Sequence, residues 1–173
     1  MKIKTLFGEE EIQNRVAELA EEMNKFYNGR EVYVIVVLKG AVVFAADLIR
    51  HFNMPVKTEF IRLSSYGANT ASSGKVHAVD IALPDLNGKN VLIIEDIIDT
   101  GLTAKFLLDF IGCNFKTKST KFCSFLDKKT ARVNDIEPDY FCFEVDDKFV
   151  IGYGLDYNGN YRNLPYVGYI QNV

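Results

Sequence analysis

The stretch Val91–Ala104, VLIIEDIIDTGLTA, places four apolar residues directly before a cluster of acids and a polar turn. The run VLII is typical of a strand that is covered on both faces. Glu95, Asp96 and Asp99 follow it within five residues. In open α/β sheets, ligands bind beyond the carboxyl ends of the strands. The stretch therefore predicts an α/β fold with a ligand site at the end of this strand.

Helical and strand patterns alternate on both sides of this stretch. Residues 9–27 carry apolar side chains at helical spacing, which predicts an amphipathic helix that ends at Asn28-Gly29. Further strands are expected over VYVIVVL, KTEFIRLSS, KSTKFCSFL, DYFCFEV and KFVIGYG, and further helices over AVVFAADLIRHF and AKFLLDFI. This alternation predicts a central, mainly parallel sheet flanked by helices.

Length and composition indicate one domain, residues 1–173, with a sizeable core, because 48% of the residues are hydrophobic. No apolar run approaches the ~20 residues that span a bilayer, and no secretion signal is visible. Cys113, Cys123 and Cys142 lie in apolar stretches without CxxC spacing, which predicts reduced core thiols. We therefore expect a cytoplasmic protein with no membrane partner.

The charge distribution speaks against a nucleic-acid partner. The net charge is -3, and no run of lysine or arginine forms a basic stripe. A phosphate-bearing small molecule is still compatible with this charge, because it needs only a few cations and backbone N–H groups.

The turn Thr100-Gly101-Leu102-Thr103 supplies such groups. A helix beginning near Thr100 would leave its first amide hydrogens unpaired, Gly101 would allow close backbone approach, and the threonine hydroxyls would add donors. The alternative is that Asp99 or Thr100 is only a helix N-cap and that the neighbouring acids are solvated. Three acids directly after VLII favour the ligand site. The chain has no GxxxxGK[ST], and the segment 152–157, GYGLDY, lacks the third glycine of GxGxxG, which excludes both of those phosphate motifs.

The strand, the acidic pair, two aliphatic residues, Asp99 and Thr-Gly-x-Thr resemble the phosphoribosyl-diphosphate motif of the type I phosphoribosyltransferases. With aspartate at position 99, the motif resembles the version found in the hypoxanthine-guanine branch of that family. The likeness runs from about Val32 to Ile170 through Leu38-Lys39-Gly40, Ser65-Tyr66, Asp127-Lys128, Lys148-Phe149-Val150 and Leu155-Asp156-Tyr157 to Arg162. It implies the type I fold, with a small hood formed from terminal segments.

The resemblance also implies how the donor, phosphoribosyl diphosphate, is bound. Glu95 and Asp96 would hold its ribose hydroxyls, and residues 99–103 would wrap its 5-phosphate. Lys39 would lie in the loop that receives pyrophosphate, often after a cis peptide bond, and Arg162 would reach the pyrophosphate. The implied donor-binding set is Lys39, Gly40, Glu95, Asp96, Asp99, Thr100, Gly101, Leu102, Thr103 and Arg162. Leu102 is a departure, because some relatives have a basic residue there.

The purine-binding residues implied by the resemblance are Ile97, Lys128, Phe149, Val150 and Asp156. Lys128 would donate to the 6-oxo group, Phe149 would stack on the base, and Asp99 would be the general base. Mg²⁺ would be the cofactor, with Glu95, Asp96 and Asp156 on the metal side. The polar loop 64–75, with Ser65 and Tyr66, would close over the reaction as a lid; composition alone fits a disordered segment equally well.

The implied reaction is purine salvage, in which hypoxanthine, and also guanine, takes the 5-phosphoribosyl group to give IMP or GMP and pyrophosphate. The enzyme would be a homodimer or homotetramer. One alternative is a non-catalytic nucleotide-sensing regulator of the same fold, which Asp99 disfavours because the pyrimidine-linked relatives generally lack it. An adenine-specific transferase is disfavoured by Lys128, because an ammonium group can only donate hydrogen bonds. The preference among hypoxanthine, guanine and xanthine stays open.

Overall fold

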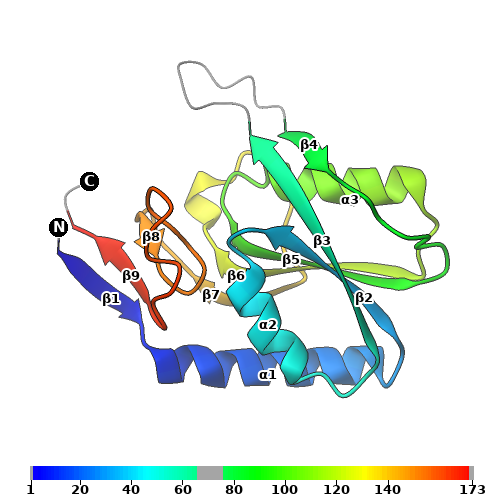
Figure 1. Cartoon of the computed structure of the whole chain (residues 1–173), viewed down its shortest axis with the longest axis horizontal. Helices are drawn as coiled ribbons and strands as arrows, with labels where there is room; N and C mark the ends of the chain where they lie inside the picture. Colours follow the sequence, from blue (N-terminus) through cyan, green and yellow to red (C-terminus); the bar gives the residue numbers. More distant parts are fainter. Residues whose placement is uncertain (1, 66–75, 172–173) are drawn as a thin grey trace.

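The core of the molecule is a six-stranded sheet with strand order β4-β3-β2-β5-β6-β7 (Figure 1). The computed structural model describes residues 2–65 and 76–171, and for residues 64, 65 and 76–80 it describes the backbone alone. Five neighbouring strands run parallel, and β4 pairs antiparallel with β3. The strands are β2 (Val32–Leu38), β3 (Val56–Ser65), β4 (Val76–Asp80), β5 (Asn90–Ile98), β6 (Ser119–Asp127) and β7 (Tyr140–Glu144). The predicted central, mainly parallel sheet is confirmed.

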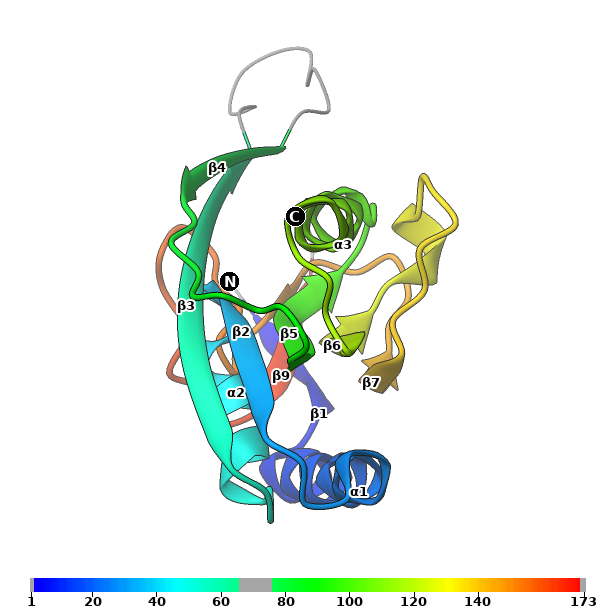
Figure 2. The ribbon, with the colours of Figure 1, turned by 90° about the vertical axis from the view of Figure 1, so that its right-hand side faces the viewer.

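Helices cover both faces of this sheet (Figure 2). They are α1 (Glu9–Tyr27), α2 (Val42–Arg50) and α3 (Leu102–Asn114), and a short 3₁₀ helix, η1 (Lys129–Ala131), follows β6. Successive residues of a strand point to opposite faces, so Val34 packs in the core with α1 and α2, and Ile35 packs in the core with α3. Both faces of β2 are therefore buried, as its continuous apolar run predicted.

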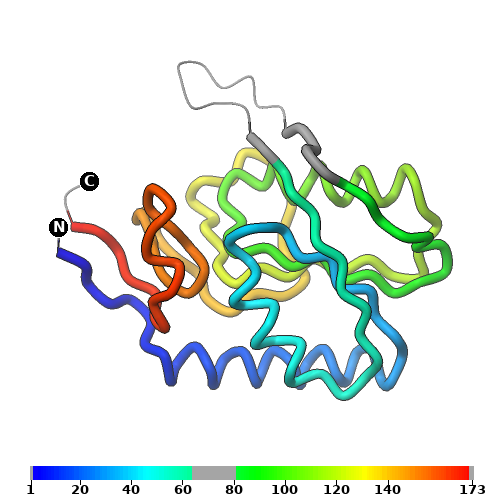
Figure 3. Tube along the Cα trace, in the orientation of Figure 1, coloured from blue at the N-terminus to red at the C-terminus, as the bar shows by residue number. Residues whose placement is uncertain are grey.

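A second, smaller antiparallel sheet joins the two ends of the chain, with strand order β1-β9-β8. It consists of β1 (Ile3–Phe7), β8 (Val150–Ile151) and β9 (Val167–Ile170). The trace in Figure 3 shows the first and last strands side by side, beyond one end of the main sheet. This sheet corresponds to the expected hood. Only two residues of KFVIGYG form a strand, because Gly152 and Gly154 adopt positive φ angles of 94° and 99°.

Three expectations need correction or fall outside the structure. Cys123 and Cys142 are buried free thiols, but Cys113 is exposed near the end of α3, so its predicted core position was wrong. The helix expected near Thr100 begins at Leu102, after a left-handed Gly101. Ser65 ends β3, whereas residues 66–75, including Tyr66, lie outside the described residues, and the lid expectation with them. Among the described residues, no helix is both long and apolar enough to cross a bilayer.

Candidate active site

The carboxyl ends of β2 and β5 meet at one edge of the sheet, since these strands pair in parallel up to Val36 and Ile94. The chain continues from β2 through a cis Leu38–Lys39 peptide bond into Gly40. A Cβ at Gly40 would lie 1.6 Å from Oδ2 of Asp96, so the carboxylate occupies the space that a larger residue would need. Only glycine is compatible with this arrangement.

The hood segment also packs against Gly40. A Cβ at Gly154 would lie 2.1 Å from the carbonyl oxygen of Gly40. Arg162 donates from Nη1 to the carbonyl of Gly154 (2.6 Å) and pairs through Nη2 with Asp156 Oδ1 (2.6 Å). This close backbone packing places the Arg162 guanidinium and the Asp156 carboxylate near the carboxyl ends of β2 and β5.

These segments enclose a polar cavity of about 240 Å³. Predicted donor-binding residues from four separate segments line it. Its lining comprises Val37, Leu38, Lys39, Gly40, Leu63, Glu95, Asp96, Thr103, Asp156 and Arg162. The structure therefore brings the predicted ribose and pyrophosphate residues together.

The two acids at the end of β5 are held in an unfavourable environment. Glu95 is 7% exposed, and burial, with the charges of Asp96 and Asp99, raises its pKa well above the ordinary range. Burial raises the pKa of Asp96 to about 6, although the Arg162 charge acts in the opposite direction. A ligand that donates hydrogen bonds or brings positive charge would relieve this cost.

The predicted phosphate turn lies at the start of α3. Gly101 has a φ of 78°, and Leu102 begins a helix of 13 residues. The amide of Thr100 donates to Asp99 Oδ1 (2.5 Å), and the amide of Leu102 makes a long contact to Thr100 Oγ1 (3.4 Å). Among the described residues, no protein acceptor pairs with the amides of Gly101, Thr103 and Ala104. A helix start with free amides is a favourable site for an anion.

A second cavity, of about 280 Å³, contains the predicted purine-binding set. Its lining comprises Asp96, Ile97, Asp99, Lys128, Lys148, Phe149, Val150, Leu155 and Asp156. Asp96 and Asp156 line both cavities, which makes the two cavities neighbours in one cleft. Thr100, Gly101 and Leu102 line neither cavity. In the chain they lie between Asp99, which lines the second cavity, and Thr103, which lines the first.

The base side of the cleft offers one cation and one exposed aromatic ring. The Lys128 side chain is only 16% exposed, and its ammonium pairs with Asp147 Oδ1 at 2.7 Å. Phe149 is 48% exposed and meets the Tyr157 ring edge-on, with 5.5 Å between the ring centroids. One face of a planar ligand could stack on Phe149 while its polar edge faces Lys128.

Sequence reasoning assigned no role to three residues near the cleft. Asp147 pairs with Lys128, Lys148 lines the second cavity, and Arg132 donates from Nε to the carbonyl of Asp99 (3.0 Å). All three lie in charged stretches, DDK and KKTARVND, which read as solvated surface. Lys148 appears only within the matched stretch Lys148-Phe149-Val150, and nothing in the pattern distinguishes Asp147 or Arg132.

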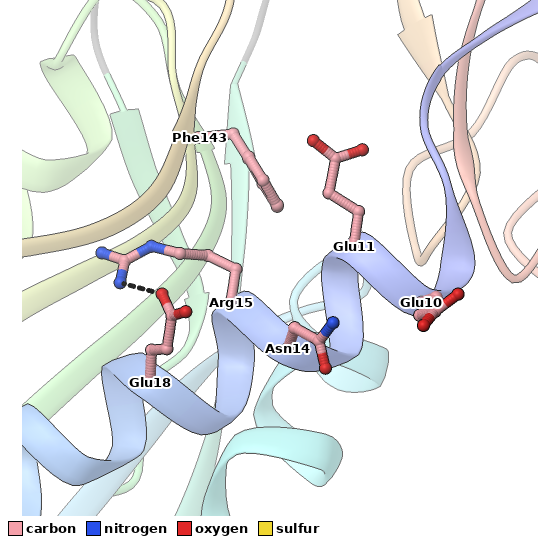
Figure 4. A pocket seen from close by; sticks show the side chains of 6 residues that line it. All are labelled: Glu10, Glu11, Asn14, Arg15, Glu18 and Phe143. Atoms are coloured by element: carbon pink, nitrogen blue, oxygen red, sulfur yellow. Dashed lines mark hydrogen bonds and ion pairs between the residues drawn. The ribbon is translucent and has the colours of Figure 1, made fainter.

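A third, open depression of about 500 Å³ lies on α1, away from the cleft (Figure 4). It is lined by Glu10, Glu11, Asn14, Arg15, Glu18 and Phe143. Arg15 is already engaged, because it donates to the carbonyls of Phe141 (2.9 Å) and Cys142 (3.2 Å) and pairs with Glu18. This depression holds no predicted site residue, and Arg15 there serves to cover the edge strand β7.

Comparisons with known proteins agree with this geometry. A family profile described as "Phosphoribosyl transferase domain" matches residues 4–158. The hypoxanthine-guanine phosphoribosyltransferase of Bacillus subtilis is 46% identical over 97% of this chain and 93% of its own length. The chain belongs to the hypoxanthine-guanine phosphoribosyltransferase family.

Other members of the family are similarly close. The hypoxanthine-guanine phosphoribosyltransferase of Aquifex aeolicus is 47% identical over 96% of this chain and 93% of its own length. A crystal structure of the Bacillus anthracis enzyme superimposes with a TM-score of 0.92 at 45% identity, covering 98% of this chain and 100% of that one. The chain is therefore an enzyme of the phosphoribosyltransferase type, and its fold is the family fold.

Proposed function

We propose that this protein transfers the 5-phosphoribosyl group from phosphoribosyl diphosphate to hypoxanthine, and also to guanine, giving IMP or GMP and pyrophosphate. One observation carries the proposal. A cavity of acids with a paired arginine adjoins a cavity with a lysine and an exposed aromatic ring, and the two share Asp96 and Asp156. The first suits a sugar diphosphate, the second suits a 6-oxo purine, and the shared wall is where the new bond would form.

The donor side positions the sugar, its 5-phosphate and its diphosphate. Glu95 and Asp96 accept hydrogen bonds from the ribose hydroxyls, which relieves part of the cost of their burial. The free amides at the start of α3, with the hydroxyl of Thr103, bind the 5-phosphate. Lys39 and Arg162 line the same cavity and bind the departing pyrophosphate.

The base side selects and activates the purine. Lys128 donates to the 6-oxo group, Phe149 stacks on the ring, and Ile97, Val150 and Asp156 complete the wall. Asp99 accepts the imidazole proton as the ring nitrogen attacks the anomeric carbon. One oxygen of Asp99 accepts the Thr100 amide, which fixes the carboxylate and leaves the other oxygen for the base.

Mg²⁺ is the proposed cofactor, and the residues present fit it. Among the described residues, no group of three or more His, Cys, Asp or Glu forms a metal cluster. Mg²⁺ commonly keeps several waters and takes only one or two carboxylates together with substrate phosphates. Asp156 and the pair Glu95 and Asp96 supply hard oxygen atoms in the donor cavity. When bound, the ion would neutralise the growing charge on the leaving pyrophosphate.

The proposal extends to assembly and location. The enzyme acts in the cytoplasm as a homodimer or homotetramer, and the exposed apolar side chains of Val42 (40%) and Phe60 (53%) support self-association. Analytical ultracentrifugation at several concentrations tests this. A monomer at micromolar concentration would refute it.

A panel of bases tests the catalytic proposal. The protein is incubated with phosphoribosyl diphosphate, Mg²⁺ and hypoxanthine, guanine, xanthine or adenine, and the nucleotide formed is identified by mass spectrometry. IMP and GMP are expected, each with an equal amount of pyrophosphate. AMP as the main product, or no nucleotide with any base, would refute the proposal.

A further inference from the structure

The segment that begins at Arg132 lies directly beneath the phosphate turn. The Nε of Arg132 donates to the carbonyl of Asp99 (3.0 Å), and the amide of Val133 donates to the carbonyl of Thr100 (3.1 Å). Two consecutive carbonyls of the turn are thus bonded to one segment. A Cβ on Gly101 would lie 2.8 Å from Cδ of Arg132, so the arginine side chain also packs closely under the turn.

These bonds set the direction of the amides. In a trans peptide, the carbonyl and the following N–H point in opposite directions. With the Thr100 carbonyl directed at Val133, the N–H of Gly101 points away from this segment, and it has no acceptor among the residues described. The contacts that hold these two carbonyl groups therefore also direct the N–H of Gly101 away from the segment.

Arg132 is itself firmly anchored. Its side chain is 8% exposed, and its two other nitrogens donate to Asp127 Oδ1 and to the carbonyl of Ile136. Asp127 is fully buried at the end of β6. The guanidinium therefore connects the turn to the central sheet, and it lines neither cavity of the cleft.

We propose that Arg132 is a positioning residue that holds the phosphate turn with its amides toward the ligand, so that it determines affinity for the 5-phosphate and not for the base. The proposal rests on the proposed function, which assigns residues 99–103 to the 5-phosphate. Asp127 keeps the guanidinium in place, and the substrate touches neither residue.

The test needs a variant that folds. Removing Arg132 alone would leave Asp127 as a buried, unpaired carboxylate, whose Oδ2 already has no hydrogen-bond partner. The double substitution Arg132→Met with Asp127→Leu removes both charges and fills the space with apolar atoms, a replacement that proteins often tolerate. The matched control, Asp127→Asn, keeps the bond from Arg132 to Asp99. Thermal unfolding of all three proteins confirms folding.

Isothermal titration calorimetry with IMP and with inosine supplies the readout, because the two ligands differ only in the 5-phosphate. The double variant is expected to bind IMP ~10- to 100-fold more weakly than the wild type, with inosine affinity changed less than about 3-fold. Asp127→Asn should keep both affinities within about 3-fold.

Three results would overturn the role of Arg132. The double variant could bind IMP as tightly as the wild type, or lose affinity for IMP and inosine by the same factor, or be matched in its loss by Asp127→Asn. A separate result concerns the proposed function itself. If the wild-type protein binds IMP no better than inosine, the turn is not a 5-phosphate site, and both proposals fail.

Discussion

The two sides of the cleft are built differently. The proposed donor side consists mainly of the ends of β2 and β5 and the turns directly after them, with Asp156 and Arg162 added from the segment after β8, and Glu95 there is 7% exposed. The proposed base side combines the end of β5, with Asp96, Ile97 and Asp99, and residues from segments after β6 and around β8, and Phe149 there is 48% exposed. Most of the donor side is therefore continuous with the core, whereas most of the base side lies on segments outside the main sheet. Changes on the donor side should therefore affect stability, and changes on the base side should affect selectivity.

The electrostatics differ in the same way. Burial raises the pKa values of Glu95 and Asp96, so the donor side carries an electrostatic cost that a bound ligand can reduce. On the base side, the partner of Lys128 is Asp147, whose side chain is 86% exposed. Water can solvate the Asp147 carboxylate when it leaves Lys128, whose own side chain is 16% exposed. Lys128 can exchange this partner for a ligand oxygen at small cost.

The largest effect is expected at Asp99, which lines the base-side cavity directly before the phosphate turn. Asp99→Asn should lower kcat by ~10²- to 10⁴-fold, because the amide cannot accept the imidazole proton. IMP formation at saturating substrates measures this. The control is Asp109→Asn, which removes an exposed carboxylate of α3 that pairs with Lys105. A kcat within about 3-fold of the wild type in Asp99→Asn would exclude the general-base role.

Lys128→Ala should affect only the base. Loss of a charged hydrogen bond is expected to lower kcat/KM for hypoxanthine and guanine by ~10- to 100-fold, leave KM for phosphoribosyl diphosphate unchanged and narrow the discrimination against adenine. The adjacent Lys129→Ala is a matched control, because Lys129 is exposed and pairs with Glu144. If Lys128→Ala keeps full selectivity, Lys128 does not read the 6-oxo group.

Asp96→Asn should stabilise the fold while weakening donor binding. The folded pKa of Asp96, about 6, exceeds the unfolded value near 4, so the folded state holds this proton more tightly. Wild-type stability therefore includes a loss that develops as the pH rises from about 4 to about 6. The variant escapes this loss and should be more stable at pH 7.5 by about 1–2 kcal/mol, after allowance for partial solvent exposure.

Urea unfolding of wild type and Asp96→Asn at pH 7.5 and pH 4.5 measures the difference. The gain in the free energy of unfolding should shrink at the lower pH. A variant that is less stable than the wild type at pH 7.5 would show that the ionised Asp96 is well accommodated in the empty site.

The smallest effect is expected at Phe149. Phe149→Leu keeps an apolar side chain but removes the stacking surface, which should raise KM for hypoxanthine by ~3- to 10-fold with little change in the free energy of unfolding. The control is Phe26→Leu, which replaces an exposed aromatic ring of α1 that lines neither cavity. An unchanged KM in Phe149→Leu would mean that the base does not stack on this ring.

Local patterns predicted much of the main sheet. The strands β2 and β5 are continuous apolar runs, which by themselves indicate burial on both faces, and the acids from Glu95 to Asp99 predicted the candidate site at the end of β5. The hood strands β1 and β9 are short, and each is stabilised by pairing with a partner at the other end of the chain. Such pairing leaves little trace in local sequence, and these strands appeared only as the terminal hood that the family resemblance implied.

Tertiary contacts decided the rest of the site. Arg132 is buried only because Asp127, Asp99 and Ile136 converge on it from three segments. Gly40 is required only because Asp96 occupies the space beside it. Cys113 is exposed near the C-terminal end of α3, although the sequence interpretation placed it in an apolar stretch. None of these facts follows from composition or spacing.

A crystal structure of the protein with IMP is the most direct test of the two-sided cleft. We expect the 5-phosphate to lie against the amides of residues 101–104, the base to stack on Phe149, and its 6-oxo group to lie within hydrogen-bond distance of Lys128 in place of Asp147. IMP bound in the reverse orientation, or outside the space between Asp96 and Asp156, would contradict the assignment of the two sides.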